Sequence, residues 1–159
     1  QFARVVGASV IATTSSPAKA ERLKALGAHH VIDCRADPDW GASARRLVEG
    51  RLDLVVEVGG AATLDQSLRA IRSGGTIALI GVLSGAKAPV TLTLAVMRQV
   101  RMQGVTCGSR EDLEAMIRAI AANGIDPAIS HRFALDEARE AFATMKSDAH
   151  VGKIVVGMG

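Results

Sequence analysis

Short, continuous apolar runs alternate with segments of helical pattern, and this alternation constrains the fold more than any other feature of the chain. The runs are rich in β-branched residues, as is typical of strands buried on both faces of a parallel sheet. They occur at 9–14, 30–33, 52–58, 76–81 and 100–106. Helical patterns between or after them cover 17–26, 40–48, 64–71 and 110–122. Strand and helix in strict succession predict an α/β fold with a doubly wound parallel sheet.

The pattern changes near residue 126. A short apolar run at 132–135, a helix from about 136 and a final strand at 153–156 predict a separate, small β-α-β element. The excess of basic residues lies before residue 110, and the remainder of the chain is net acidic. We therefore divide the chain into a first part, 1–127, and a second part, 128–159.

Composition excludes several classes of protein. With 48% apolar and 22% charged residues, the chain can build a packed core. No apolar run approaches the roughly 20 residues that cross a bilayer, and no export leader is visible. Aromatic residues make up only 3% of the chain, and basic residues never run beyond a pair, which argues against nucleic-acid binding. Cys34 and Cys107 form no Cys-x-x-Cys motif, so we expect a reducing, cytoplasmic location.

The turn after the run 9–14 carries the clearest functional signal, because ligands of open parallel sheets bind at the carboxyl ends of the strands. Proteins that bind NAD carry a carboxylate at such a turn, where it hydrogen-bonds the ribose hydroxyls. This chain has Ser15, Ser16 and, one turn into the following helix, Lys19. Hydroxyls, a helix N-terminus and a lysine suit a 2′-phosphate, which favours NADP over NAD. The alternative is that the serines only cap the helix and Lys19 is solvated.

Glycines follow two successive predicted strands. Gly59 and Gly60 come after 52–58, and Gly81 and Gly85 come after the next run. Glycine at a strand exit lets a flat ring or a ribose approach the backbone closely, so we expect one extended crevice there.

Two charged residues and the histidines have open roles. Glu57 is either a satisfied core carboxylate, which we favour, or a ribose contact. Lys153 is either a ligand of a phosphate or ribose or a solvated lysine. The four histidines show no metal-ligand spacing, so we expect structural roles for them and no metal bound by this chain.

Taken in order, these motifs resemble the medium-chain dehydrogenase/reductase superfamily, in particular its zinc-type alcohol dehydrogenase-like and quinone oxidoreductase branches. The matching segments cover nearly the whole chain, at 1–27, 30–35, 53–60 (DLVVEVGG), 68–81 and 150–156 (HVGKIVV). The resemblance implies a Rossmann-type sheet and an NAD(P)-dependent oxidoreductase with a small-molecule substrate. Such an enzyme transfers hydride between nicotinamide and an alcohol or carbonyl, a quinone or an enone.

The resemblance also implies roles for individual residues. It places the 2′-phosphate at Ser15, Ser16 and Lys19, and the adenine near Cys34. It implies that the nicotinamide half of the cofactor lies beside Val58, Gly59, Ile80, Gly81, Val82, Leu83, Val105, Thr106 and Cys107, with Lys153 near the cofactor. In relatives, the strand matching 100–106 pairs with its twin, which implies a homodimer through that edge.

The chain departs from the family pattern in two respects. Relatives often carry an aromatic residue near the adenine, where this chain has Cys34. The motif Gly-x-Gly-x-x-Gly, which in this fold follows the first strand of the sheet, is also absent. In the strand order 3-2-1-4-5-6, that first strand lies at the centre of the sheet. We therefore expect the chain to lack the central strand, the pyrophosphate loop and the amino-terminal catalytic domain. Residues 1–127 would then be a partial dinucleotide-binding (Rossmann) domain, and 128–159 a segment that returns to the catalytic domain. The family's zinc ligands, where present, would lie in that missing part. The resemblance assigns no acid or base catalyst to a residue of this chain, so we expect this fragment alone to be inactive.

Two other functions stay open. One is a non-catalytic nucleotide-binding or oligomerisation module that lacks a catalytic half. The other is a methyltransferase, which would normally carry the carboxylate that is missing after Thr14.

Overall fold

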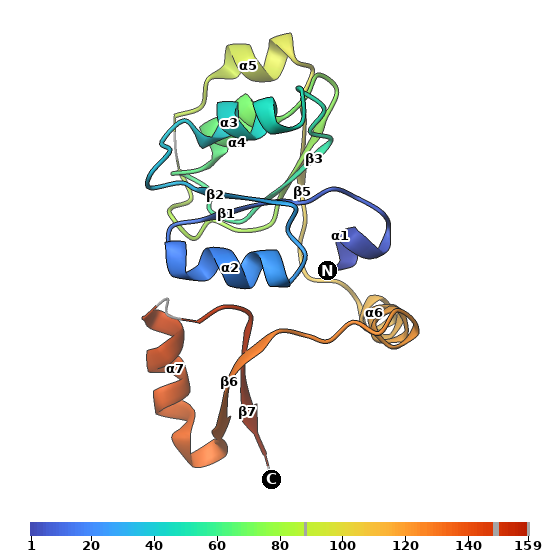
Figure 1. Cartoon of the computed structure of the whole chain (residues 1–159), viewed down its shortest axis with the longest axis vertical. Helices are drawn as coiled ribbons and strands as arrows, with labels where there is room; N and C mark the ends of the chain where they lie inside the picture. The colour runs from blue at the N-terminus through green and yellow to red at the C-terminus, as the bar shows by residue number, and fades with distance from the viewer. Residues whose placement is uncertain (88, 148–149, 159) are drawn as a thin grey trace. The chain divides into compact units, whose positions relative to one another are not determined.

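Strands and helices alternate along the chain (Figure 1) in the computed structural model, which describes residues 1–87, 89–147 and 150–158. The strands are β1 (Ile11–Thr14), β2 (His30–Asp33), β3 (Leu54–Glu57), β4 (Thr76–Leu79), β5 (Arg101–Gly104), β6 (Ile129–Ala134) and β7 (Lys153–Gly157). The helices are α1 (Phe2–Val5), α2 (Pro17–Ala25), α3 (Trp40–Leu47), α4 (Leu64–Ala70), α5 (Leu92–Met97), α6 (Arg110–Ala122), the 3-10 helix η1 (Leu135–Glu137) and α7 (Ala138–Lys146). The predicted α/β class is confirmed.

Most predicted elements are present with small shifts at their ends. The bounds of β2 and α6 match the sequence pattern, whereas β6 begins at Ile129, earlier than predicted. The helix expected from about residue 136 is divided into η1 and α7. Helix α5 was not predicted, because its threonine and valine residues are weak helix formers and its six residues show little periodicity.

Three hydrogen-bonded ladders make up the sheet structure of the described residues. The orders are β1-β2, β3-β4-β5 and β6-β7. In the second ladder the strands are parallel, and Leu54 pairs with Thr76, which in turn pairs with Arg101. Parallel pairing is as predicted, but β1 and β3 are not bonded to each other. In the Rossmann order 3-2-1-4-5-6, β1 of this chain would be the second strand and β3 the fourth, and these two flank the first strand of that order. The absence of that strand from this chain stays a prediction.

The chain divides into two compact units. The first contains residues 1–12, 17–31 and 110–159, and the second contains 13–16 and 32–109. The sequence predicts a different division, between residues 127 and 128, because it assigns 128–159 to a catalytic domain. That assignment stays a prediction. None of the helices in the described ranges is long and apolar enough to cross a membrane.

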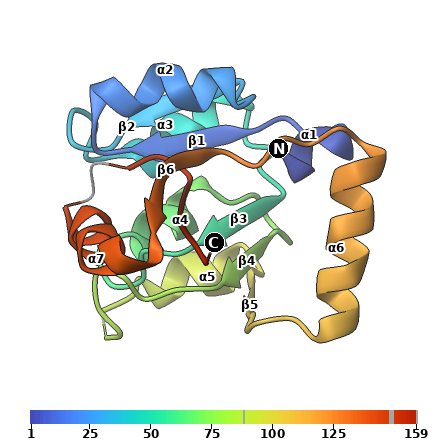
Figure 2. The same ribbon diagram turned by 90° about the horizontal axis from the view of Figure 1, so that it is seen from below.

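The core of the second unit lies between α4 and the β3-β4-β5 ladder. Leu68, Ile71 and Ile77 are fully buried. The side chains packed around them are partly buried and comprise Val55, Leu64, Leu79, Val90, Leu94, Ala95 and Val100. Helices α3, α4 and α5 are neighbours beside this ladder (Figures 1 and 2). Helix α3 approaches α4 closely because Gly41 has no Cβ to meet the carbonyl of Gln66.

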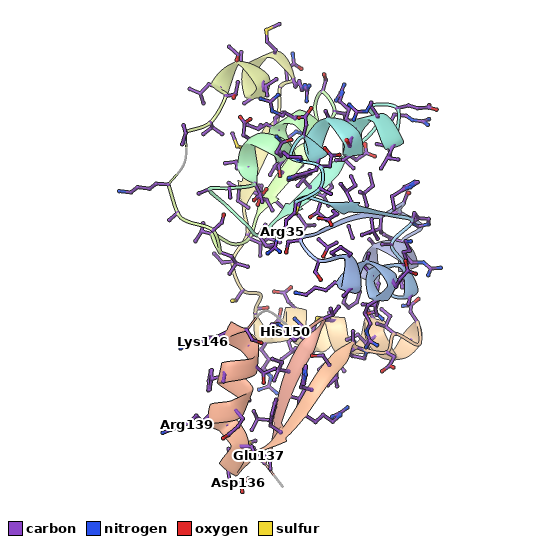
Figure 3. All side chains as sticks on the ribbon, turned by 60° about the vertical axis from the view of Figure 1, so that its left-hand side comes forward. Arg35, Asp136, Glu137, Arg139, Lys146 and His150 are labelled. Atoms are coloured by element: carbon purple, nitrogen blue, oxygen red, sulfur yellow. The ribbon has the colours of Figure 1, made fainter. Side chains whose placement is uncertain are left out.

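In the first unit, α7 packs against the parallel pair β6-β7 through the buried Ala141. Arg139 and Lys146 lie on the side of α7 that faces away from the two strands (Figure 3). At the start of β7, the amide of Lys153 donates a hydrogen bond of 2.7 Å to the carbonyl of Ala128. These contacts form a small β-α-β element, as the sequence predicted.

Candidate cofactor-binding site

The carboxyl ends of β3, β4 and β5 meet at one edge of their ladder, because the three strands are parallel. The segments that follow β3 and β4 are joined by hydrogen bonds. The amide of Leu83 donates to the carbonyl of Val58 at 3.2 Å, and the amide of Ser84 donates to that of Gly59 at 2.7 Å. The structure therefore brings together the residues predicted at these two strand exits.

The glycines of these segments serve the packing of one loop on the other. Gly60 has φ +85°, and a Cβ there would lie 2.7 Å from the carbonyl oxygen of Gly85. A Cβ on Gly81 would lie 2.7 Å from the carbonyl oxygen of Val58. The space beside these glycines is thus filled by the neighbouring loop. The glycines therefore let the two loops pack closely against each other. The crevice that we expected beside these glycines does not form where the neighbouring loop fills the space.

Exposed apolar side chains stand at the same strand exits. They are Val58, Ile80, Val82, Leu83 and Val105, with exposed fractions between 43% and 87%. Thr106 and Cys107 follow and are also exposed. Apolar side chains gathered at the carboxyl ends of parallel strands suit the faces of a flat organic ring.

Glu57 is a buried, satisfied carboxylate. It is the last residue of β3 and only 3% exposed. Its Oε1 accepts hydrogen bonds from the amides of Gly59 (2.9 Å) and Gly60 (3.0 Å) and from the hydroxyl of Thr63 (2.5 Å), while Oε2 accepts one from Ser67. These contacts support the core interpretation of Glu57, because donors within the protein satisfy both of its oxygens.

Burial raises the pKa of the Glu57 carboxyl, but its hydrogen bonds from Ser67, Thr63 and the amides of Gly60 and Gly59 outweigh this effect. The net pKa is below its ordinary value of 4.5. Glu57 is consequently an anion at neutral pH.

Sequence reasoning did not identify Thr63, Ser67 or Ser84. Thr63 is the N-cap of α4 and Ser67 lies four residues further on, in the middle of the helix, so their hydroxyls lie on one helix face. Ser84 joins the two loops, since its Oγ donates to the carbonyl of Gly59 at 2.7 Å and accepts from the amide of Ala62 at 2.9 Å. A pattern in the sequence could have indicated these contacts. A glutamate near the end of a strand is followed by two glycines and then by two hydroxyl residues four positions apart.

The turn after β1 is organised by Thr14, which is 7% exposed. Its Oγ1 accepts a hydrogen bond of 3.1 Å from the amide of Ser16. Its carbonyl accepts from both the amide (2.8 Å) and the thiol (3.0 Å) of Cys34. The structure thus brings Cys34 to the turn that contains Ser15 and Ser16. Their contacts with a cofactor stay predictions.

The two predicted lysine ligands belong to the first unit. Lys19 lies in the first turn of α2, and Lys153 is the first residue of β7. Their roles at a phosphate or a ribose also stay predictions.

The histidines have local roles where the structure defines them. Nδ1 of His29 accepts a hydrogen bond of 3.0 Å from the amide of Val10, and His131 stacks on Phe133 with ring centroids 6.1 Å apart. His150 lies between α7 and β7 (Figure 3), and its Nδ1 is buried with no hydrogen-bond partner among the described residues. Within the described ranges, no three His, Cys, Asp or Glu side chains gather as a metal site.

Fold and strand exits together define a Rossmann-type α/β protein. The family model described as zinc-binding dehydrogenase matches residues 1–122. The chain belongs to this family, within the medium-chain dehydrogenase/reductase superfamily, which confirms the resemblance seen in the sequence.

Curated relatives are oxidoreductases by name. A zinc-type alcohol dehydrogenase-like protein of Schizosaccharomyces pombe is 34% identical over 98% of this chain and 46% of its own length. An L-threonine 3-dehydrogenase of Ruegeria pomeroyi is 41% identical over 86% of this chain and 42% of its own length. The chain thus spans less than half the length of these relatives.

Solved structures agree with this assignment. The chain superimposes on an NAD-dependent alcohol dehydrogenase with a TM-score of 0.90 and 31% identity, over 99% of this chain and 46% of the other. It matches a crotonyl-CoA carboxylase/reductase in complex with NADP with a TM-score of 0.86 and 28% identity, over 97% and 45%. Both NAD and NADP therefore occur among the similar proteins.

Proposed function

We propose that the chain is the carboxyl-terminal, cofactor-binding part of an NADP(H)-dependent oxidoreductase. The observation that carries this proposal is the row of exposed apolar side chains at the carboxyl ends of β3, β4 and β5. Substrates of the whole enzyme would be alcohols or carbonyls, quinones or enones. The family membership and the names of the relatives support oxidoreduction as the chemistry.

The residues at these strand exits fit the nicotinamide half of a dinucleotide. Val58 and Gly59 would lie beside the nicotinamide ribose. The segments that would line the ring contain Ile80, Gly81, Val82, Leu83, Val105, Thr106 and Cys107. When bound, the nicotinamide supplies or accepts the hydride, and these side chains hold the ring and exclude water. The catalytic acid or base, and any zinc ligands, would come from the length of the relatives that this chain does not span.

The turn after β1 favours NADP, with NAD as the alternative. It contains no carboxylate, and Thr14 holds Ser16 in the turn through its hydroxyl. We expect Ser15, Ser16 and Lys19 to bind the 2′-phosphate, Cys34 to lie near the adenine, and Lys153 to contact the cofactor. An anion at the start of α2 would also interact favourably with the helix dipole.

Binding of 2′,5′-ADP to the intact protein tests this assignment. We expect saturable binding by calorimetry, and a roughly tenfold loss of NADPH affinity on Lys19→Ala, since a charge-assisted phosphate contact is removed. Lys24→Ala is the matched control, because Lys24 lies on the same helix and pairs with Glu21. If the intact protein bound NAD but not 2′,5′-ADP, the choice of NADP would be wrong.

We also propose a homodimer through residues 100–106. The residues of β5 are exposed, and among the described strands it pairs only with β4. A free strand edge is a template for pairing with a second copy. Light scattering on the intact protein should give twice the chain mass. Gln103→Lys, which sets like charges across the edge, should weaken the dimer, whereas Gln99→Lys outside the strand should not.

The competing proposal is a non-catalytic nucleotide-binding or oligomerisation module. A turnover screen of the intact protein with NADPH against quinones, enones and aldehydes separates the two. Oxidation of NADPH with any of these classes supports the enzyme. Binding of NADPH without turnover, across all three classes and with alcohols and NADP in the reverse direction, would favour the module. In both cases we expect this chain alone to be inactive.

A further inference from the structure

The carboxylate of Glu57 holds a loop that the proposed cofactor site uses. It accepts hydrogen bonds from the backbone amides of both Gly59 and Gly60, directly after β3. It also accepts hydrogen bonds from Thr63, the N-cap of α4, and from Ser67 within that helix. One buried carboxylate is thereby hydrogen-bonded to the loop that follows β3, which contains Gly59 and Gly60, and to α4, the helix after that loop.

No lysine, arginine or histidine pairs with Glu57 in the ion pairs of the described residues. The negative charge is balanced by neutral donors alone, each of which points at one of two oxygens. Hydrogen bonds to a charged group are stronger than those between neutral groups, and they are also shorter and more directional. The carboxylate is therefore well suited to fix the positions of its donors.

The same loop is held from its other side by the segment after β4. The carbonyl of Gly59 accepts from both the amide and the hydroxyl of Ser84, each at 2.7 Å. Both backbone polar groups of Gly59 are thus used within the protein. A Gly-Gly pair would otherwise be free to adopt many conformations, and this freedom would have to be lost on binding a ligand.

Val58 precedes the two glycines and remains 45% exposed, although its neighbour Glu57 is buried. The buried carboxylate fixes the direction of the chain immediately after this side chain. The apolar contact that Val58 offers is consequently presented in one orientation before any ligand arrives.

We propose that Glu57 is a positioning residue for the nicotinamide half of the cofactor, which it orients through the Val58–Gly60 loop without touching the cofactor itself. This inference rests on the proposed function. It assigns the residue no part in hydride transfer and no contact with the adenosine half, whose turn follows a different strand, β1.

The test compares two probes on the intact protein. NADPH occupies both halves of the proposed site, whereas 2′,5′-ADP occupies only the adenosine half. Glu57→Met keeps the side-chain length and removes both acceptor oxygens. We expect NADPH to bind this variant about tenfold more weakly, with 2′,5′-ADP changed less than about twofold. Glu57→Gln, which keeps one acceptor oxygen, should fall between Glu57→Met and the wild type.

A second measurement reports on the loop itself. Amide hydrogen exchange of residues 58–61 should be faster in Glu57→Met without cofactor, because the amides of Gly59 and Gly60 lose their acceptor. The fluorescence of bound NADPH should also change, because the nicotinamide is held in a less uniform orientation. Glu49→Gln, at an exposed glutamate that pairs with Arg51, is the control and should alter neither readout.

The outcomes separate this proposal from the function on which it rests. If the wild type bound neither probe, the proposed function would fail, and the positioning role with it. If the wild type bound both, equal loss of both probes in Glu57→Met would overturn the positioning role alone, as would unchanged NADPH binding. Should Glu57→Met not fold, Thr63→Val removes one donor from the same carboxylate, and a selective loss of about threefold for NADPH is expected.

Discussion

The guanidinium of Arg98 donates a hydrogen bond of 2.7 Å to the carbonyl oxygen of Leu68, in the last turn of α4. The same Nη1 donates to the carbonyl of Arg69 at 2.8 Å, and Arg45 donates to that of Ile71 at 2.8 Å. Carbonyls at the end of a helix have no partner within it, and cations there also interact favourably with the helix dipole. Two arginines from outside α4 thus complete its carboxyl end, beside the buried Leu68 and Ile71.

Replacing Arg98 by methionine should therefore destabilise the second unit by about 1–2 kcal/mol, because at least two carbonyls lose a charged donor. Burial and the nearby charges of Arg45 and Arg69 lower the pKa of Arg98, so part of this contribution is offset by repulsion. Urea unfolding, followed by the fluorescence of Trp40, measures the change. Arg35→Met, at an exposed loop position, should leave the free energy of unfolding unaltered.

Stability should depend on pH through Glu57. Its pKa is lower in the folded state than its ordinary value of 4.5, so the unfolded chain binds the proton more readily. The contribution of Glu57 is then fully present above about pH 4.5 and is lost as the pH falls towards the folded pKa. In Glu57→Gln, the free energy of unfolding should change less steeply with pH below 4.5. Equal slopes in variant and wild type, measured by urea unfolding, would contradict this.

Alanine at position 60 should be poorly tolerated. The residue has φ +85°, and a Cβ would meet the backbone of Val82 at 2.9 Å as well as that of Gly85. Backbone strain and overpacking together should cost about 2–4 kcal/mol. Gly104→Ala is the control, since a Cβ there has nothing within 4 Å. Thermal unfolding of the two variants should separate them clearly.

Glycine at position 99 should stabilise the protein. Gln99 has φ 51° directly after the end of α5, in the left-handed region where glycine is favoured. Relief of this conformation should exceed the added entropy of the unfolded chain, with a net gain of about 0.5 kcal/mol. The melting temperature of Gln99→Gly should rise. Gln103→Gly, within β5, should lower it, because that residue is in an extended strand.

The fold was predictable wherever the pattern was local. Helix α6 has Ser109 before it, acidic residues in its first turn and Gly124 just after it, and these local signals predict its bounds. Strand β2 is a short β-branched run between turns and was also correctly bounded. Helix α5 was not predictable in this way, because contacts of Leu94 and Ala95 with the core stabilise a segment of weak intrinsic preference.

In the candidate site, too, local features were predictable from the sequence, whereas features that depend on tertiary contacts were not. That glycines follow β3 and β4 is plain from the sequence, and the family pattern supplied a role for the exposed apolar residues near them. The reason for the glycines was different from the one expected. Gly60 and Gly81 make room for the neighbouring loop, and only the pairing of β3 with β4 brings those loops together.

By itself the sequence determined the α/β class, the order of the elements and the strand exits that carry the functional signal, because these depend on residue type and spacing along the chain. The role of Glu57 was decided only by the tertiary structure. A glutamate near the end of a buried strand suits either a ribose or a core. The outcome depends on whether donors in the following loop and helix reach it, and folding brings the amides of Gly59 and Gly60 and the hydroxyls of Thr63 and Ser67 to its two oxygens.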